Sequence, residues 1–164
     1  MTQVTFVCTG NVCRSAAAEA ILRKMVKDRR IPDVKVNSVG TFNLCGEQRD
    51  GTMARIAANY GYEMTGTSTF RTAEVFQEAD LILVMTYTHK LEVQNVLPYA
   101  HWGRIRLFME YCFDKDIPVE DPSHMPEGVY LRTFQLLEQG CRIIADRLQE
   151  GSEKNLKENT EDDS

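Results

Sequence analysis

The sequence contains a cysteine and an arginine six positions apart, Cys8 and Arg14, with Ser15 directly after the arginine. A cysteine thiolate is a nucleophile, and the planar guanidinium of arginine can hold two phosphoryl oxygens at once. The residues between them include a glycine and would form a tight loop before a helix, where free amide N–H groups and the helix dipole attract a dianion. That field favours the Cys8 thiolate, and Ser15 can donate a hydrogen bond to its sulfur. The predicted phosphate-binding residues are Thr9, Gly10, Asn11, Val12, Cys13 and Arg14.

The flanking residues predict the elements that position this loop. Residues 4–7 (VTFV) have the pattern of a short buried strand, and residues 16–27 are rich in helix formers. A C-x5-R spacing alone is weak evidence, because cysteines at strand ends are often buried apolar residues and arginines in a first helical turn are often surface charges. The glycine, the hydroxyl after the arginine and the strand–loop–helix setting together favour catalysis.

Strand-like and helix-like segments alternate along the chain. This alternation predicts an α/β fold with a parallel sheet covered by helices on both faces, and ligands of such folds bind at the carboxyl ends of the strands, where Cys8 lies. The expected strands are near residues 3–8, 33–38, 81–84 and 104–108, and the expected helices near 16–29, 51–60, 72–78, 87–95 and 126–149.

Composition indicates one domain. The chain has 164 residues, 43% of them hydrophobic, which suffices for a single core over residues 1–150, whereas residues 151–164 are polar and charged and are expected to be disordered. Five irregularly spaced cysteines argue for a reducing compartment, so we expect a cytoplasmic protein. The absence of a long apolar run, a net charge of −5 and three scattered histidines predict no membrane attachment, no nucleic-acid partner, no metal and no cofactor.

The stretch CTGNVCRSAAAE resembles the active-site loop of the low-molecular-weight protein tyrosine phosphatases. Residues 38–41 (SVGT), residues 80–85 and Asp121-Pro122 match later family motifs in the family's order, so the resemblance covers about residues 3–150. It implies a three-layer sandwich with a four-stranded parallel sheet of flavodoxin-like order, the phosphatase I-like fold. It also implies hydrolysis of phosphotyrosine through a cysteinyl-phosphate, with Cys8 as nucleophile and Arg14 as phosphate clamp, in a monomer or weak dimer.

The chemistry independently requires an acid such as Asp121. Expelling a phenolate is costly, and a positioned carboxylic acid that protonates the leaving oxygen typically contributes about 10²- to 10⁴-fold. The long stretch between residues 110 and 127 also contains Asp114, Asp116 and Glu120. Of these acids Asp121 alone precedes a proline in the family manner, which favours it as general acid and then general base.

Several departures from the family concern the walls of the pocket. Leu44 stands where many members carry a tryptophan, and His124 lies where eukaryotic members carry aromatic residues. Phe42, Tyr87 or His124 could form a substitute wall beside Leu44. Val12 favours phosphotyrosine, because the related arginine phosphatases tend to have threonine there. Leu44 and the helix after the third strand resemble the bacterial branch that dephosphorylates tyrosine autokinases, which makes such a kinase the expected phosphoprotein partner.

Further departures concern the support of the loop and its redox chemistry. Thr86 replaces an acidic residue common after the third strand, and the family's D-P-R segment becomes Asp50-Gly51-Thr52, so we expect altered hydrogen bonds beneath the loop. In family members with a cysteine at the position of Cys13, a reversible disulfide with the nucleophile protects it from irreversible oxidation.

Other functions on the same fold stay open. A protein-arginine phosphatase would use the same loop. An arsenate reductase would need resolving cysteines, and Cys45 and Cys112 do not have the expected spacing. A phosphocysteine carrier would have no use for Asp121, and a non-catalytic phosphoprotein-binding module would not need both Cys8 and Asp121.

Overall fold

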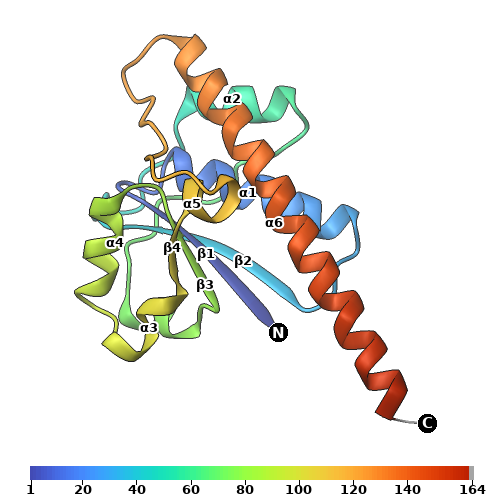
Figure 1. The fold of residues 1–164 in the computed structure, drawn as a ribbon. Coiled ribbons are helices and arrows are strands. Elements are labelled where there is room, and N and C mark those ends of the chain that lie inside the picture. The colour runs from blue at the N-terminus through green and yellow to red at the C-terminus, as the bar shows by residue number, and fades with distance from the viewer. Residues whose placement is uncertain (163–164) are drawn as a thin grey trace.

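Four parallel strands form a central sheet in the order β2-β1-β3-β4 in the computed structural model, which describes residues 1–162 (Figure 1). The strands are β1 (Thr2–Cys8), β2 (Val34–Gly40), β3 (Leu81–Val84) and β4 (Ile105–Leu107). Cys8 pairs with Gly40 at the carboxyl end of β1, and the neighbouring Val7 pairs with Val84. The flavodoxin-like order and the parallel sheet expected from the sequence are confirmed.

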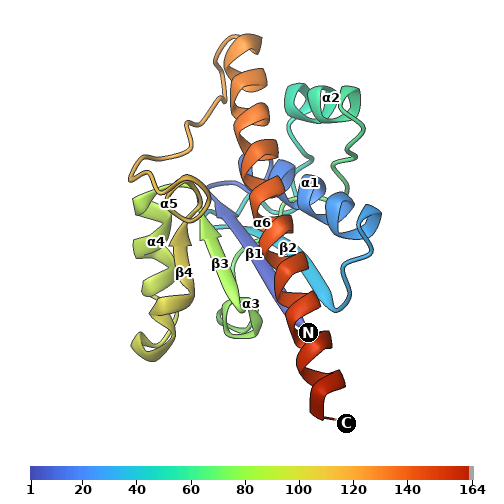
Figure 2. The same ribbon diagram turned by 45° about the vertical axis from the view of Figure 1, so that its right-hand side comes forward.

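Helices cover both faces of the sheet, as the turned view in Figure 2 shows. On one face lie α1 (Arg14–Asp28), α5 (Phe108–Phe113) and the long α6 (Glu127–Asp162), with α2 (Gly51–Asn59) packed against α1 and α6. On the other lie α3 (Ala73–Glu78) and α4 (Tyr87–Gln94), followed by the 3-10 helix η1 (Tyr99–Arg104). Each face of the sheet has its own hydrophobic core. Phe6 of β1 packs in the core beneath α1, α5 and α6, and the next residue, Val7, packs in the core beneath α3 and α4, because side chains of a strand alternate between faces.

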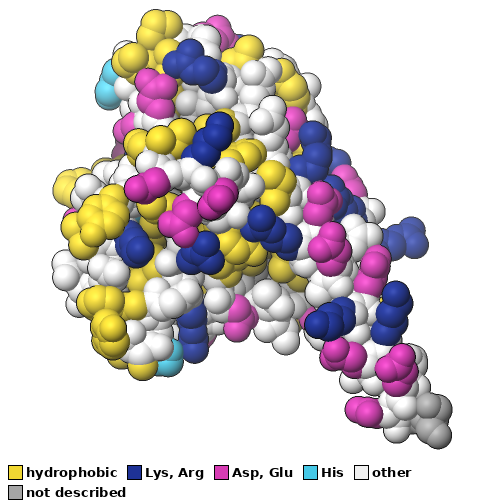
Figure 3. Space-filling view, in the orientation of Figure 1, with side chains coloured by type: hydrophobic (Ala, Val, Ile, Leu, Met, Phe, Trp, Pro, Cys, Tyr) yellow, Lys and Arg dark blue, Asp and Glu magenta, His cyan; other side chains and the backbone are white. Residues whose placement is uncertain are grey.

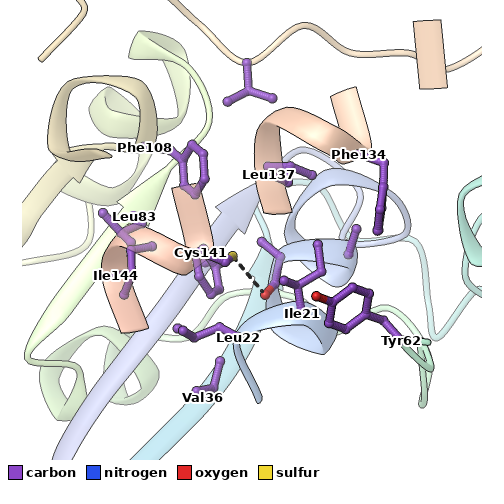
Figure 4. Packing of buried hydrophobic residues seen from close by; sticks show 14 of the residues in the cluster. Ile21, Leu22, Val36, Tyr62, Leu83, Phe108, Phe134, Leu137, Cys141 and Ile144 are labelled. Atoms are coloured by element: carbon purple, nitrogen blue, oxygen red, sulfur yellow. Dashed lines mark hydrogen bonds between the residues drawn. The ribbon is translucent and has the colours of Figure 1, made fainter. Parts of the chain in front are cut away.

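The larger core lies between the sheet and the helices α1, α5 and α6 (Figure 4). Phe134, Leu137 and Ile144 of α6 are fully buried in it, and each such side chain contributes about 1.5–3 kcal/mol on burial. Gly140 lets α6 approach α5, because a Cβ at this position would lie 2.2 Å from the ring of Phe108. This packing holds α1, and with it the start of the helix that follows Cys8, against the sheet.

The C-terminal segment differs from the expectation. The predicted disorder of residues 151–164 is wrong for residues 151–162, which continue α6 to Asp162; residues 163–164 lie outside the described part. Glutamates 150 and 153 precede lysines 154 and 157 by four residues, the spacing and order that support a helix. Figure 3 accordingly shows a projecting end with charges of both signs. Within residues 1–162 no helix is long and apolar enough to cross a membrane.

Two short elements were not expected from the sequence. Both η1 and α5 flank β4 and are only six residues long, too short for a helical period to stand out. The expected strand near 104–108 is correspondingly shortened to Ile105–Leu107. The remaining expected elements agree with the structure to within a few residues, with the end of α6 excepted.

Candidate active site

Residues 9–13 form the predicted loop between the end of β1 and the first turn of α1. The loop bends at Asn11, whose φ of 57° lies in the left-handed region that asparagine tolerates better than most residues. Gly40 of the neighbouring strand passes so close that a Cβ there would lie 2.6 Å from the carbonyl oxygen of Thr9. The next amides, of Thr41 and Phe42, donate hydrogen bonds to the carbonyls of Cys8 (3.0 Å) and Thr9 (2.9 Å). The strand β2 therefore braces the loop from outside.

The side chain of Asn11 connects the loop to the Cys8 thiol. Its Nδ2 donates to the hydroxyls of Ser15 (2.9 Å) and Ser38 (2.8 Å), which uses both of its hydrogens. Because the Ser15 oxygen already accepts this bond, its own hydrogen is free to point at Cys8 Sγ, 2.9 Å away. Ser15 can thus donate to the sulfur as the sequence predicted, and it is completely buried with Asn11.

Arg49 supports Asn11 from the other side, a contact that sequence reasoning missed. Its Nη1 donates to the backbone carbonyl of Asn11 and, at 3.0 Å, to Asn11 Oδ1, which also accepts from the amide of Thr69 at 2.8 Å. The Arg49 side chain is 9% exposed and lies 3.7 Å from the carboxylate of Glu19 on α1. Burial lowers the pKa of Arg49 and raises that of Glu19, and the attraction between the two charges opposes both shifts.

The structure shows what Asp50 and Thr86, at two positions that depart from the family pattern, do beneath the loop. Arg49, directly before the altered Asp50-Gly51-Thr52 segment, supplies hydrogen bonds to the loop, while Asp50 caps α2 by accepting from the amide of Met53 at 2.9 Å. Thr86 caps α4 by accepting from the amide of His89 at 3.3 Å. An arginine in a loop gives no signal of such a role in one sequence, because its partner Asn11 lies 38 positions away.

We expect Arg49→Ala to lower kcat about tenfold, because a hydrogen bond to a charged group contributes about 1.5–3 kcal/mol and only part of this loss reaches the reacting thiol through Asn11 and Ser15. Arg49→Lys, which keeps one donor, should recover part of the loss. The rate of Cys8 alkylation by iodoacetate at neutral pH should fall in parallel. Arg55→Ala, at an exposed arginine paired with Glu127, is the matched control. An unchanged kcat and alkylation rate in Arg49→Ala would contradict the role.

Arg14 and Asp121 meet at the mouth of the loop although they are 107 positions apart in the sequence. The Arg14 side chain is 5% exposed; its Nη1 donates to the carbonyl of Val119 at 3.0 Å, and its Nη2 lies 3.7 Å from the carboxylate of Asp121. Val119 is itself fully buried, and its amide donates to the carbonyl of Met85 after β3 at 2.9 Å. Val119, which sequence reasoning did not single out, anchors the segment that carries Asp121.

The other acids of this segment have different surroundings. Asp114 ends α5 in a left-handed conformation. Asp116 lines a cavity whose described lining includes neither Arg14 nor Asp121, and Glu120 pairs with Arg132 at 3.2 Å. For Asp121, burial raises the pKa, but hydrogen bonds from Ser123 and the charges of Arg14 and His124 outweigh it and lower the pKa below its ordinary value. Asp121 is therefore ionised at neutral pH.

His89 is a second contact that the sequence did not reveal. Its Nδ1 accepts from the amide of Thr86 at 3.2 Å, so in the neutral ring Nε2 carries the proton and donates to Thr9 Oγ1 at 2.9 Å. Burial, with a contribution from the Arg14 charge, lowers the pKa of His89 to about 4, which keeps the ring neutral at neutral pH. The Thr9 hydroxyl then has its own hydrogen available for a ligand.

A cavity of about 490 Å³ opens over the loop, with Arg14 and Thr9 in its lining. Cys8 is only 3% exposed beside them. The described residues that line this cavity are Thr9, Arg14, Thr41, Phe42, Thr86, Thr88, His89, Glu92, Pro118, Val119, Glu120 and Asp121. Arg14 is therefore the cation that a phosphoryl group entering this cavity would meet.

The predicted pocket walls are placed as follows. Phe42 lines the cavity and is 62% exposed. Val12, Leu44, Tyr87 and His124 are not among the described lining residues. Val12 packs against the core, Leu44 covers Gly10, and Tyr87 faces the neighbouring cavity. His124 lies close enough to Asp121 for its charge to affect the pKa of that carboxyl.

Cys13 is buried in the same loop as Cys8, and both are free thiols. Burial, and next the charge of Asp50, raise the pKa of Cys13, so this thiol stays protonated at neutral pH. The redox pairing of the two stays a prediction: after mild peroxide treatment, attack of Cys13 on a Cys8 sulfenic acid would release water and form a disulfide. Mass spectrometry checks it, and finding only sulfinic or sulfonic Cys8 would contradict it.

The other thiols give no support to arsenate reduction. Cys112 lies in the core, where its Sγ donates to the carbonyl of Gly140 at 3.5 Å and burial raises its pKa to about 12. Cys45 is exposed in the loop after β2. Among residues 1–162 no group of three His, Cys, Asp or Glu side chains is placed to hold a metal ion.

Comparison with known proteins agrees with this geometry. The family model of the low molecular weight phosphotyrosine protein phosphatases matches residues 3–155. The low molecular weight protein-tyrosine-phosphatase Etp of Escherichia coli K12 is 36% identical over 146 residues, 88% of this chain and 93% of that protein. A solved low molecular weight phosphotyrosine phosphatase from Vibrio cholerae O395 has a TM-score of 0.85 at 30% identity, covering 92% of this chain and 99% of that one.

A solved arginine phosphatase is similar to the same extent in its fold. YwlE from Geobacillus stearothermophilus has a TM-score of 0.85 at 27% identity and covers 94% of this chain and 97% of that chain. Fold similarity alone therefore does not separate the two activities. The family model is described as that of phosphotyrosine protein phosphatases, and Etp, at 36% identity, is named a protein-tyrosine-phosphatase. The chain belongs to the low molecular weight phosphotyrosine protein phosphatase family.

Proposed function

We propose that this enzyme hydrolyses phosphotyrosine in proteins in two steps, with Cys8 as nucleophile, Arg14 as phosphate clamp and Asp121 as general acid and base. The observation that carries these roles is the convergence of three segments. Arg14 stands 3.7 Å from the carboxylate of Asp121 at the mouth of the loop, and the Cys8 thiol at its start is hydrogen-bonded to Ser15. A phosphoryl group held by Arg14 and the loop amides would lie between a nucleophile and an acid.

In the first step the Cys8 thiolate attacks phosphorus, and the bond between phosphorus and the tyrosyl oxygen breaks. The proton of the Asp121 carboxyl goes to the departing oxygen, so that tyrosine leaves as a neutral phenol. Arg14 holds two equatorial oxygens and stabilises the charge that develops on them. The product is a cysteinyl-phosphate and an ionised Asp121.

In the second step a water molecule attacks the phosphorus of the cysteinyl-phosphate. Asp121, now ionised, takes a proton from this water, and the bond between phosphorus and Cys8 Sγ breaks. The sulfur leaves as a thiolate, which the Ser15 hydroxyl stabilises from 2.9 Å away. Inorganic phosphate is released and the thiolate is restored. Once phosphate has left, Asp121 gives its proton to solvent and stays ionised until the next substrate binds.

Binding of the substrate favours the protonated form of Asp121. In the free enzyme Ser123 and Arg14 favour the ionised form of Asp121. A phosphate dianion beside the carboxyl adds like charge and engages Arg14, and both changes raise the pKa of Asp121. Protonation of the acid is thus coupled to occupancy of the loop.

A partner and a compartment are also part of this proposal. We propose a phosphotyrosine-bearing protein, a tyrosine autokinase in particular, as the substrate. The resemblance of Leu44 and of the helix after β3 to the bacterial branch supports this choice. All five cysteines are free thiols in the structure, which supports a reducing compartment such as the cytoplasm.

The test is hydrolysis of phosphotyrosine, phosphoserine and phosphoarginine peptides of one sequence, measured as released phosphate. We expect turnover of phosphotyrosine to exceed the others, because the matching family model and the relative Etp are named for phosphotyrosine or tyrosine phosphatases. Preference for phosphoarginine would transfer the enzyme to the activity named for YwlE. Stable phosphorylation of Cys8 without release of phosphate would instead indicate a carrier.

A further inference from the structure

A second cavity of about 420 Å³ adjoins the one over the loop and shares Thr86, Thr88 and Pro118 with it. Its remaining described lining is Tyr87, Leu107, Asp116 and Ile117. It lies between the start of α4 and the segment that leads to Asp121, so a polypeptide held over the loop can extend into it.

The surface of this second cavity is apolar and open. Tyr87 is 62% exposed and Ile117 is 50% exposed, although both are large hydrophobic residues, while Leu107 is buried at 5%. Exposed apolar side chains that meet around a cavity indicate a binding surface more often than scattered ones do. Figure 3 shows hydrophobic side chains gathered at the surface over α4. The site is therefore suited to an apolar side chain.

Charge narrows the choice of ligand. Of the described residues lining the two cavities, four are carboxylates, Glu92, Asp116, Glu120 and Asp121, and one is a cation, Arg14. Arg14 is 4% exposed and is directed at the phosphate site. Glu120 is paired with Arg132 and Asp121 lies beside Arg14, so Glu92 and Asp116 are the carboxylates that make the rim outside the phosphate site negative. An acidic side chain would be repelled there.

We propose that the second cavity binds an apolar side chain of the phosphoprotein substrate, near the phosphotyrosine in its sequence, a proposal that rests on the proposed function. The two cavities share Thr86, Thr88 and Pro118 in their linings, so they adjoin each other. An extended chain adds roughly 3.3 Å per residue, so a residue a few positions from the phosphotyrosine can reach the second cavity. The preferred substrate carries leucine or another large apolar residue within about four positions of the phosphotyrosine and lacks acidic residues beside it.

The experiment measures kcat/KM for phosphotyrosine peptides in a glycine–serine background, with leucine, serine or glutamate placed at each position up to four residues on either side. For the wild type we expect leucine at one position to raise kcat/KM about tenfold over serine, the gain of burying much of one apolar side chain. Glutamate at that position should lower it. Ile117→Ser and Tyr87→Ser should lose the leucine preference, and Leu156→Ser, at a 60% exposed leucine on the projecting end of α6, should retain it.

Para-nitrophenyl phosphate separates this proposal from the proposed function, because it is too small to reach the second cavity. Ile117→Ser and Tyr87→Ser should hydrolyse it at the wild-type rate. Normal turnover of it, with equal kcat/KM for leucine and serine peptides at every position, would overturn this proposal alone. Absence of any turnover by the wild type would overturn the proposed function and this proposal with it. A wild-type dimer that Ile117→Ser dissociates, with peptide preference unchanged, would assign the surface to a second copy.

Discussion

Replacing Cys8 by serine should lower the turnover of phosphotyrosine by at least about 10³-fold, because a serine hydroxyl is not ionised at neutral pH and no base stands beside it in the loop. The sulfur has one hydrogen-bond partner among the described side chains, Ser15, and that hydroxyl is placed to donate. Oxygen at this position would therefore stay protonated and unreactive. Initial rates with a phosphotyrosine peptide measure the loss.

The same variant should still bind phosphate. Arg14 and the loop amides are unchanged in Cys8→Ser, so calorimetry should give a dissociation constant for inorganic phosphate within a few-fold of the wild-type value. Cys45→Ser, at an exposed thiol, is the matched control and should keep full activity. If Cys8→Ser bound phosphate normally and retained more than a few per cent of the wild-type rate, Cys8 would not be the nucleophile.

Asp121→Asn should lower kcat for phosphotyrosine by about 10²- to 10³-fold, because asparagine has a similar shape but has no acidic proton to give to the departing oxygen. The loss should be smaller for para-nitrophenyl phosphate, since nitrophenolate is a weaker base and needs less help to leave. Glu120→Gln, which neutralises the adjacent carboxylate paired with Arg132, is the matched control and should change kcat little. Equal losses in the two variants would show that Asp121 acts only through the general charge of the rim.

The pH dependence of kcat and of kcat/KM also tests the role of Asp121 as general acid. Hydrogen bonds from Ser123 and the charges of Arg14 and His124 lower the pKa of Asp121 in the free enzyme despite the opposing effect of burial. Bound phosphate raises it, so the fall of kcat with rising pH should lie at a higher pH than the corresponding fall of kcat/KM. In Asp121→Asn the alkaline fall of kcat should disappear. A fall that persists unchanged in this variant would belong to another group.

The contacts near the loop show how much of the site can be predicted from one sequence. The bond between Cys8 and Ser15 joins residues seven positions apart, and Asn11 bonds to Ser15 over four. Such contacts follow from a strand, a tight turn and a helix start in succession, and each of these has a local signal in glycine content, apolar pattern or helix formers. The alternation of these patterns likewise predicted the parallel sheet and its cover of helices. Asp121 was singled out by its resemblance to a family motif, since its local sequence resembles any turn before a proline.

The tertiary structure decided which distant side chains complete the site. Arg14 meets Val119 across 105 positions, His89 meets Thr9 across 80 and Arg49 meets Asn11 across 38. Contacts of this kind depend on the strand order and on how each loop packs over the sheet, which no local pattern specifies. By itself the sequence predicted the candidate nucleophile and the candidate phosphate loop, and it predicted the fold class that the structure confirms, because neighbouring residues control short backbone segments. Only the tertiary structure decided three features: the hydrogen bonds of Arg49 and His89 to the loop, the position of Asp121 beside Arg14, and the adjoining apolar cavity. Each forms where segments distant in sequence converge at the carboxyl ends of the strands.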